Sequence, residues 1–245
     1  MTMQIDVAIP TYGGESTIED CLTHLVEAIQ PSQFQINRLL IDWKPADNLD
    51  STGRNVSDFC MNRNISHVIH KNDHNLPESR QFLIEQIQTE WFLFLDDDVL
   101  LSPDAMTAGY AAISPAVGGI QSRRATDTHT PAEWSRWRPV RGTLFASLIR
   151  MQALEDIEIP SDITVLEDEY IREHIDNEGY LWLFDHQFQF LHKSQHRHEI
   201  DFNEGRIAGK YGLLPIWYVF GNVAYNPVDP KHYKRAIGYV KGRWL

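Results

Sequence analysis

The sequence predicts an α/β fold, in which a mostly parallel sheet carries helices on both of its faces. The first observation behind this is the alternation of short apolar runs with segments whose apolar residues recur at helical spacing. The second is that acidic residues directly follow apolar runs, as Asp42 follows residues 39–41 and Asp96 follows residues 91–95. Parallel strands end at one edge of such a sheet, where ligands bind. A chain of 245 residues, 42 % of them hydrophobic, is long enough for one such domain and a tail.

In the first half of the chain, apolar runs and turn residues alternate. The predicted strands here cover residues 6–10, 39–41, 66–70 and 91–95. The run 91–95 is the clearest, because five consecutive apolar residues suit a central strand that is buried on both faces. A helix is predicted over 18–29 after a capping box of Ser16 and Glu19, and another from Pro77 to about residue 88. Residues 44–58 are polar and rich in turn-forming residues.

The second half continues the alternation. Its predicted elements are a helix capped by residues 102–104, a strand at 117–121, a strand followed by a helix at 144–154, a helix at 167–177 and a strand at 188–191. Gly179 suits the C-terminal cap of the helix 167–177. Residues 122–141 form an irregular stretch that is rich in arginine and tryptophan.

Charge and cysteine content exclude several classes of protein. The chain holds 34 acidic residues against 22 basic ones, a formal charge of -12, which disfavours binding to nucleic acid. Its two cysteines, Cys21 and Cys60, have no metal-binding or redox spacing and are expected as reduced thiols. No signal peptide is recognisable and no apolar run is long enough to span a membrane, so we expect the protein in the cytoplasm.

Three aspartates, Asp96, Asp97 and Asp98, follow the most apolar strand of the chain. Carboxylates this close together raise one another's pKa and destabilise the fold, and a divalent cation removes this repulsion. Oxygen ligands of this type suit magnesium, manganese or calcium. The alternative is a solvated acidic turn that caps the following helix. The position at the end of a buried strand favours the metal site.

A second acidic cluster lies at the start of the predicted helix 167–177, as residues 167–169. One explanation is structural, because negative charge in the first turn is favoured by the helix dipole. The other is that one of these carboxylates accepts a proton from an attacking hydroxyl group. Three histidines, His192, His196 and His198, follow the last predicted strand. A single histidine is usually structural or solvated, whereas three within seven residues favour one metal ligand among them.

These motifs, in this order, resemble the family 2 glycosyltransferases of GT-A fold over roughly residues 5–200. Residues 7–12 are similar to the opening strand and nucleotide-contacting turn of the family. Residues 94–98 (Phe-Leu-Asp-Asp-Asp) are similar to its DXD motif, and residues 166–172 to its ED motif on the acceptor side. Asp42, Arg80 and His192 match further positions of the family pattern. The resemblance implies a GT-A type fold, that is, a Rossmann-like, mostly parallel mixed sheet flanked by helices on both faces.

The resemblance also implies roles for single residues. Base and ribose of a nucleotide-sugar donor would be surrounded by Pro10, Thr11, Tyr12, Glu15 and Asp42. Arg80 would face the diphosphate or the base edge, Asp96 would contact the ribose, and Asp97 would assist donor or metal binding. Asp98 and His192 would hold a divalent cation, Mn²⁺ or Mg²⁺. Asp168 would be the general base, with Glu167 beside it and Trp134, Trp137 and Arg141 on the acceptor side.

The implied reaction transfers a sugar from a UDP- or GDP-type donor to the hydroxyl group of a saccharide or lipid-linked acceptor, with inversion. Two departures from the family pattern concern the base and the donor. Gly13 stands where the family usually has Asn. After Asp42 the family usually has a second acidic residue together with Gly and Ser, whereas this chain has residues 43–45 (Trp-Lys-Pro). The alternatives are a nucleotidyltransferase of similar fold and a non-catalytic nucleotide-sugar-binding protein.

The predicted organisation is a GT-A glycosyltransferase domain over residues 1–205 and an extension over 206–245. Residues 1–100 would form the nucleotide-binding half of the domain and residues 101–205 the acceptor half. The extension has seven Lys or Arg residues against one acid, Asp229, with aromatic residues interleaved. It is expected either to pack on the domain, to join subunits, or to make peripheral contact with a membrane surface.

Overall fold

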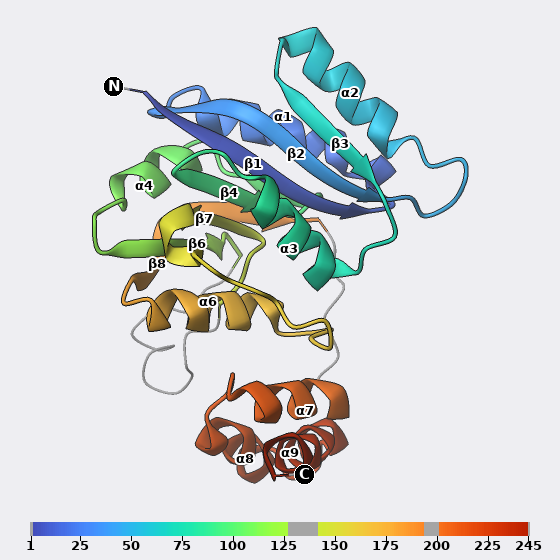
Figure 1. Cartoon of the computed structure of the whole chain (residues 1–245), viewed down its shortest axis with the longest axis vertical. Helices are drawn as coiled ribbons and strands as arrows, with labels where there is room; N and C mark the ends of the chain where they lie inside the picture. The colour runs from blue at the N-terminus through green and yellow to red at the C-terminus, as the bar shows by residue number, and fades with distance from the viewer. Residues whose placement is uncertain (1, 127–141, 194–200, 245) are drawn as a thin grey trace. The chain divides into compact units, whose positions relative to one another are not determined.

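The computed structural model describes residues 2–126, 142–193 and 201–244 (Figure 1). The chain divides into two compact units. The first comprises Met1–Asp127, Thr143–Glu158 and His174–Gln195, and the second Thr128–Gly142, Ile159–Glu173 and His196–Leu245.

In the described part of the chain, every strand belongs to one mixed sheet of the first unit, in the order β3-β2-β1-β4-β7-β6-β8-β5. The strands are β1 (Met3–Tyr12), β2 (Phe34–Lys44), β3 (His67–Lys71), β4 (Trp91–Leu95), β5 (Val99–Leu101), β6 (Val117–Arg124), β7 (Ala146–Arg150) and β8 (Leu181–His192). Neighbours among β1 to β4 are parallel, as are β6 and β8. The pairs of β7 with β4 and β6, and of β5 with β8, are antiparallel.

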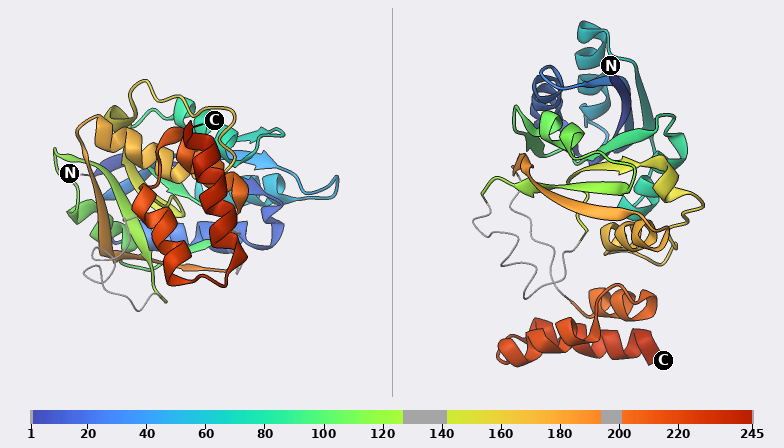
Figure 2. Two further views of the ribbon diagram at one scale, coloured as in Figure 1. Left: turned by 90° about the horizontal axis from the view of Figure 1, so that it is seen from below. Right: turned by 90° about the vertical axis from the view of Figure 1, so that its left-hand side faces the viewer.

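Helices cover both faces of this sheet, because the strand order reverses after β3. The helices associated with the sheet in the first unit are α1 (Ile18–Ile29), α2 (Thr52–Arg63), α3 (Leu76–Gln86) and α4 (Ala105–Ala111), whereas α6 (Glu167–Asn177) is divided between the two units after Glu173. Connections between parallel strands are right-handed, so the steps β1–α1–β2 and β2–α2–β3 put α1 and α2 on one face. The step from β3 back to β4 puts α3 on the other face (Figures 1 and 2).

The main core lies between the sheet and these helices, and it follows the apolar pattern of the sequence. All five residues of β4 are buried, as a central strand between two helical layers requires. On α1 the buried residues recur at helical spacing, at Ile18, Cys21, Leu22, Leu25 and Ile29. Cys60 is also buried, and both thiols are free.

Several predicted elements need correction. The capping box of Ser16 and Glu19 is wrong, because Ser16 lies in a short 3-10 helix, Gly14–Ser16, and the cap of α1 makes no side-chain hydrogen bond. Part of the turn-rich stretch 44–58 is helical, since α2 begins at Thr52. The capping box of α3 is instead made by Asn75 and Glu78, and that helix ends at Gln86. The predicted strands at 6–10, 39–41, 117–121 and 188–191 are longer in the structure, and residues 122–124 extend β6.

Within the described residues, the second unit contains the first part of α6, up to Glu173, and the helices α7 (Phe202–Tyr211), α8 (Ile216–Tyr225) and α9 (Pro230–Trp244). Helices α7 and α9 approach closely through four glycines, because a Cβ atom on any of them would collide with backbone atoms of the opposite helix. These glycines are Gly205 and Gly209 on α7 and Gly238 and Gly242 on α9. Among the described residues, no helix combines the length and apolar character that crossing a membrane requires.

Candidate active site

Side chains with catalytic chemistry meet at the edge of the sheet where β1, β2 and β4 end. These strands are parallel, and Pro10 of β1 lies in register with Asp42 of β2. The aspartates that follow β4 therefore reach the same edge as the turn that follows β1. The structure brings the predicted residues from these three segments together in the first unit.

Thr11, Gly14 and Asp97 are in direct contact at this edge. The Thr11 hydroxyl donates a hydrogen bond to Oδ2 of Asp97. A Cβ atom on Gly14 would collide with this carboxylate and this hydroxyl, so a larger residue would have to displace one of these two side chains. Gly13, just before it, has φ 58°, the left-handed region that favours glycine. A Cβ atom on Gly13 would also approach the Cβ atom of Ala46 to 2.8 Å, which is a local steric reason for glycine at this position.

The carboxyl group of Asp97 has an unusual proton affinity. Burial raises its pKa to about 6, the hydrogen bond from Thr11 opposes this increase, and the Asp98 charge adds to it. A raised pKa at a cluster of carboxylates is typical of a functional site. Nearby positive charge from a cation would favour the ionised form.

Asp96 is held by Phe145, the residue just before β7, and by Arg80 of α3. Its backbone N–H donates to the carbonyl of Phe145 over 2.9 Å. Nη2 of Arg80 lies 3.5 Å from Oδ1 of Asp96. The Arg80 side chain is only 4 % exposed, and its Cζ atom lies 5.8 Å from the centroid of the Phe94 ring. The guanidinium group is thus fixed beside the acidic cluster.

Asp98 and His192 form a second pair. His192 ends β8 and lies in register with Val99, the residue after Asp98. Its Nε2 atom lies 3.2 Å from Oδ1 of Asp98, and the two side chains are 8 % and 18 % exposed. The Phe145 ring packs against the imidazole, with 5.1 Å between ring centroids.

The donor set of Asp98 and His192 fits a divalent cation. Carboxylate oxygen and imidazole nitrogen are both ligands of Mn²⁺, and magnesium sites use one or two carboxylates with substrate phosphates completing the shell. Within the described residues there is no group of three or more His, Cys, Asp or Glu side chains arranged to hold a metal. Among the described residues, Asp98 and His192 are the pair that would hold such an ion, and the remaining coordination positions would then be open to substrate.

Asp42 is surrounded by two partners that the sequence did not single out. Its side chain is 2 % exposed and accepts hydrogen bonds from Nδ2 of Asn72 and, over 3.2 Å, from Nδ1 of His74. Both partners follow β3, which lies in register beside β2. Their position just after a predicted parallel strand was the available signal, because that is where side chains reach the ligand edge.

Glu15 and Tyr12 lie in the turn after β1. Glu15 accepts a hydrogen bond from the hydroxyl of Ser51, which links this turn to the loop before α2. That loop is organised by Asp50, whose carboxylate accepts from the backbone N–H groups of Ala46 and Thr52. Tyr12 is 68 % exposed, so its ring is available to a ligand.

Asp168 lies in the second unit, in the first turn of α6. Its Oδ1 atom accepts a hydrogen bond from the backbone N–H of Glu169, over 2.8 Å. Leu166, two residues before Asp168, has φ 65°, which is a strained conformation for a leucine. Glu169 is buried and accepts from the N–H of Gly142 over 2.7 Å and from Arg172. The start of this helix is thus firmly positioned, and Glu167 is buried in the same turn.

The remaining predicted acceptor-side residues, Trp134, Trp137 and Arg141, lie outside the described residues, as do His196 and His198. Their roles stay predictions.

Comparisons with known proteins agree with the family that the sequence motifs resemble. The family model described as glycosyl transferase family 2 matches residues 6–165. A comparison with curated proteins gives no match.

Several solved structures share the fold. A mannosyltransferase, PcManGT from Pyrobaculum calidifontis, in complex with GDP-Man and Mn²⁺, is 14 % identical, with a TM-score of 0.65 over 100 % of this chain and 72 % of that one. Glucosyl-3-phosphoglycerate synthase from Mycobacterium tuberculosis, with Mn²⁺, UDP and phosphoglyceric acid, is 12 % identical, with a TM-score of 0.54 over 79 % and 72 % of the two chains. TarS from S. aureus is 14 % identical, with a TM-score of 0.60 over 84 % and 39 %. The predicted GT-A type fold is confirmed.

Proposed function

This chain belongs to glycosyl transferase family 2, and from that premise we propose that it transfers a sugar, with inversion, from a nucleoside-diphosphate donor to an acceptor hydroxyl group. The observation that carries the proposal is the pairing of Asp98 with His192 beside the Thr11–Asp97 contact at the ligand edge of the sheet. The family leaves no support for the nucleotidyltransferase alternative.

In the proposed reaction, Asp168 accepts the proton of the acceptor hydroxyl. The oxygen of that hydroxyl attacks the anomeric carbon, and the bond from this carbon to the diphosphate oxygen breaks. The nucleoside diphosphate leaves with the electron pair, and the configuration inverts because attack and departure occur on opposite sides. The start of α6 suits this role, since the backbone N–H of Glu169 orients the carboxyl of Asp168.

The donor-side residues bind and orient the nucleotide. Asp42, held by Asn72 and His74, presents carboxylate oxygens that accept N–H groups of a base. Both uracil and guanine carry such N–H groups, so a UDP- or a GDP-type donor is compatible. Pro10, Thr11, Tyr12 and Glu15 line the turn that contacts base and ribose, together with Asp96. Arg80 places a fixed positive charge near the diphosphate.

Asp98 and His192 would hold a divalent cation, Mn²⁺ or Mg²⁺, with Asp97 adjacent. Bound there, the ion would neutralise the negative charge that grows on the leaving diphosphate. PcManGT and the glucosyl-3-phosphoglycerate synthase were solved with such ions. The acceptor is a saccharide or a lipid-linked compound, bound by the half of the domain that contains Glu167 and Asp168.

The donor class can be determined by thermal shift with UDP- and GDP-sugars, each with Mn²⁺ and with chelator. We expect one class to raise the melting temperature only with metal, because a ligand that binds the folded state stabilises it by mass action. Asp98→Asn should lose this shift, whereas Asp104→Asn, an exposed aspartate at the start of α4, should keep it. No shift with any donor would leave the family standing and remove the proposed donor.

The base is tested by Asp168→Asn. We expect the donor-dependent shift to persist and the transfer rate to fall about 10²- to 10⁴-fold, the usual contribution of general acid–base catalysis. Asp176→Asn, an exposed position on the same helix, is the matched control and should keep wild-type activity. Near wild-type transfer by the Asp168 variant would show that another group takes the proton.

A further inference from the structure

Helix α9 of the second unit has two faces of different chemistry. One face is buried against the helices of its own unit and contains Arg235, Gly238, Tyr239 and Gly242. The opposite face carries Tyr233, Ile237, Val240 and Trp244, which are 43 %, 62 %, 38 % and 61 % exposed. Their spacing of four, three and four residues places them in one stripe along the helix. Contiguous apolar patches that are exposed on a folded protein mark interaction sites.

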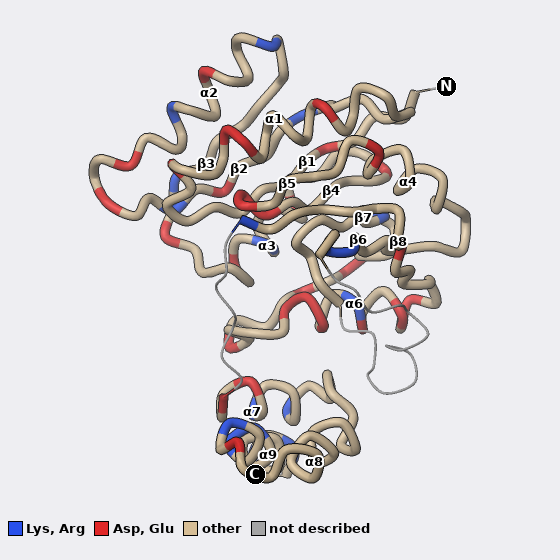
Figure 3. The backbone as a smooth tube through the Cα atoms, turned by 180° about the vertical axis from the view of Figure 1, so that it is seen from behind, with Lys and Arg blue, Asp and Glu red and all other residues tan. Residues whose placement is uncertain are grey.

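Helix α8 extends the apolar surface. Its sequence, IWYVFGNVAY, contains no charged residue, and Figure 3 shows it free of acidic and basic positions. Three of its large side chains, Ile216, Trp217 and Phe220, are 49 %, 59 % and 41 % exposed. Within the described residues of this helix, only Val219 is fully buried.

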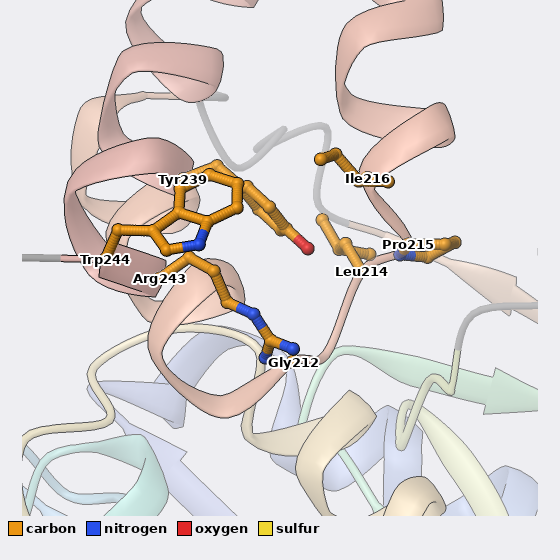
Figure 4. Close-up of a pocket in the computed structure, with 7 residues that line it drawn as sticks. All are labelled: Gly212, Leu214, Pro215, Ile216, Tyr239, Arg243 and Trp244. Carbon is orange, nitrogen blue, oxygen red and sulfur yellow. The ribbon is translucent and has the colours of Figure 1, made fainter.

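The exposed ends of the two helices meet at a cavity. It has a volume of about 370 Å³ and is lined by Gly212, Leu214, Pro215, Ile216, Tyr239, Arg243 and Trp244 (Figure 4). Ile216 comes from the start of α8 and Trp244 from the end of α9, so the cavity joins the two apolar surfaces. Arg243 brings a positive charge to its wall.

Basic side chains border the stripe of α9 on both sides. At 100° per residue, Lys234 and Lys241 lie on one flank of the stripe and Arg243 on the other. All three are exposed. Helices α8 and α9 contain no acidic residue, and Asp229, just before α9, already pairs with Lys231 over 2.9 Å. The surface is therefore both apolar and positively charged.

We propose that this surface of α8 and α9 docks on an anionic lipid bilayer. Tryptophan and tyrosine rings favour the boundary between acyl chains and headgroups, where an apolar ring and a polar tip are both satisfied. The lysines and Arg243 extend along the same boundary toward lipid phosphates. A protein partner would satisfy the apolar side chains as well, but the cations on both flanks match a negatively charged plane. This docking goes beyond the proposed transfer reaction and does not depend on it.

Vesicle flotation tests the proposal with the full chain. We expect the protein to float with vesicles of about one part phosphatidylglycerol to two parts phosphatidylcholine, and not with phosphatidylcholine alone. The reason is that each basic residue near an anionic surface raises the partition coefficient about fivefold. Lys234→Gln with Lys241→Gln should weaken binding to the anionic vesicles about 30-fold. Ile237→Ser with Trp244→Ser should weaken it at least tenfold by removing apolar burial.

Matched controls come from exposed positions on α2. Arg54→Gln removes a charge and Met61→Ser an exposed apolar side chain, and both variants should float as the wild type does. Circular dichroism and the donor thermal shift of each variant separate loss of docking from loss of fold or of donor binding. A wild-type protein that stays entirely in the soluble fraction would overturn the proposal. This holds whether light scattering shows the protein to be a monomer or a dimer. Equal flotation with neutral vesicles would overturn its electrostatic part.

Discussion

Asp97 shows how one residue links the acidic cluster to stability. Burial raises its pKa from 3.8 to about 6 in the folded chain. Between these two values the folded state binds the proton more tightly than the unfolded state does. The free energy of unfolding must therefore fall as the pH rises through this window, by on the order of 2 kcal/mol when no cation is bound.

Urea unfolding in the presence of chelator, at several pH values between about 4 and 7, measures this effect. We expect Asp97→Asn to lose that part of the pH dependence, since the amide does not titrate, while Asp104→Asn keeps it. Mn²⁺ should reduce the fall in the wild type, because a nearby cation favours the ionised carboxylate. An identical pH dependence in wild type and Asp97→Asn would show that the carboxyl of Asp97 is not perturbed.

Residue-scale chemistry also sets a limit on what the sequence can predict. Asp42 was recognisable because it follows an apolar run, whereas its partners Asn72 and His74 had only the weaker signal of following a predicted strand, since their residue types are those of ordinary loops. Only the parallel pairing of β2 with β3 brings them to Asp42. The contact of Thr11 with Asp97 has the same origin, because it joins residues 86 positions apart.

At the scale of elements, the predictions succeeded where burial alone decides. The strand 91–95 and the helix 167–177 have the predicted bounds. The sequence missed β5, whose three residues are too few to show a period. It also missed α2, because the start of that helix depends on the loop that Asp50 organises, and few apolar residues mark its buried face.

The pairing of α7 with α9 was not visible in the sequence for a different reason. Glycine lowers helix propensity, so Gly205, Gly209, Gly238 and Gly242 count against these helices when each is considered alone. In the folded unit they allow a backbone contact that no larger residue permits. The cost in propensity is offset by packing that only the paired helices can make.

Gly209→Ala tests this contact. A methyl group there would collide with the backbone of Tyr239, so the helices must separate, and overpacking of this kind destabilises by about 1–3 kcal/mol. Gly221→Ala on α8 is the control, because no atom lies within 4 Å of its added Cβ. That variant should be unchanged or more stable by about 0.5–1 kcal/mol. Chemical denaturation followed by circular dichroism compares the two, and equal stability would contradict the close packing.

At the scale of the whole molecule, charge is distributed very unevenly along the chain. The chain has a formal charge of -12, and residues 206–245 hold seven basic residues and one acidic residue, which is +6. Residues 1–205 therefore carry -18. An anionic surface attracts the short basic segment and repels the much larger acidic part. Which effect dominates depends on how far the electric field reaches.

Ionic strength changes that reach, and we expect a non-monotonic effect on docking. At about 0.15 M salt the Debye length is about 8 Å, so only charges at the lipid surface, such as Lys234 and Lys241, contribute. At about 0.01 M it is about 30 Å, and the repulsion of the acidic part also reaches the bilayer. At about 1 M even the lysines are screened. Flotation with anionic vesicles should therefore be strongest at intermediate salt. A steady increase of binding down to the lowest salt would show that the acidic part does not sense the membrane, and that the basic surface alone governs the electrostatics of docking.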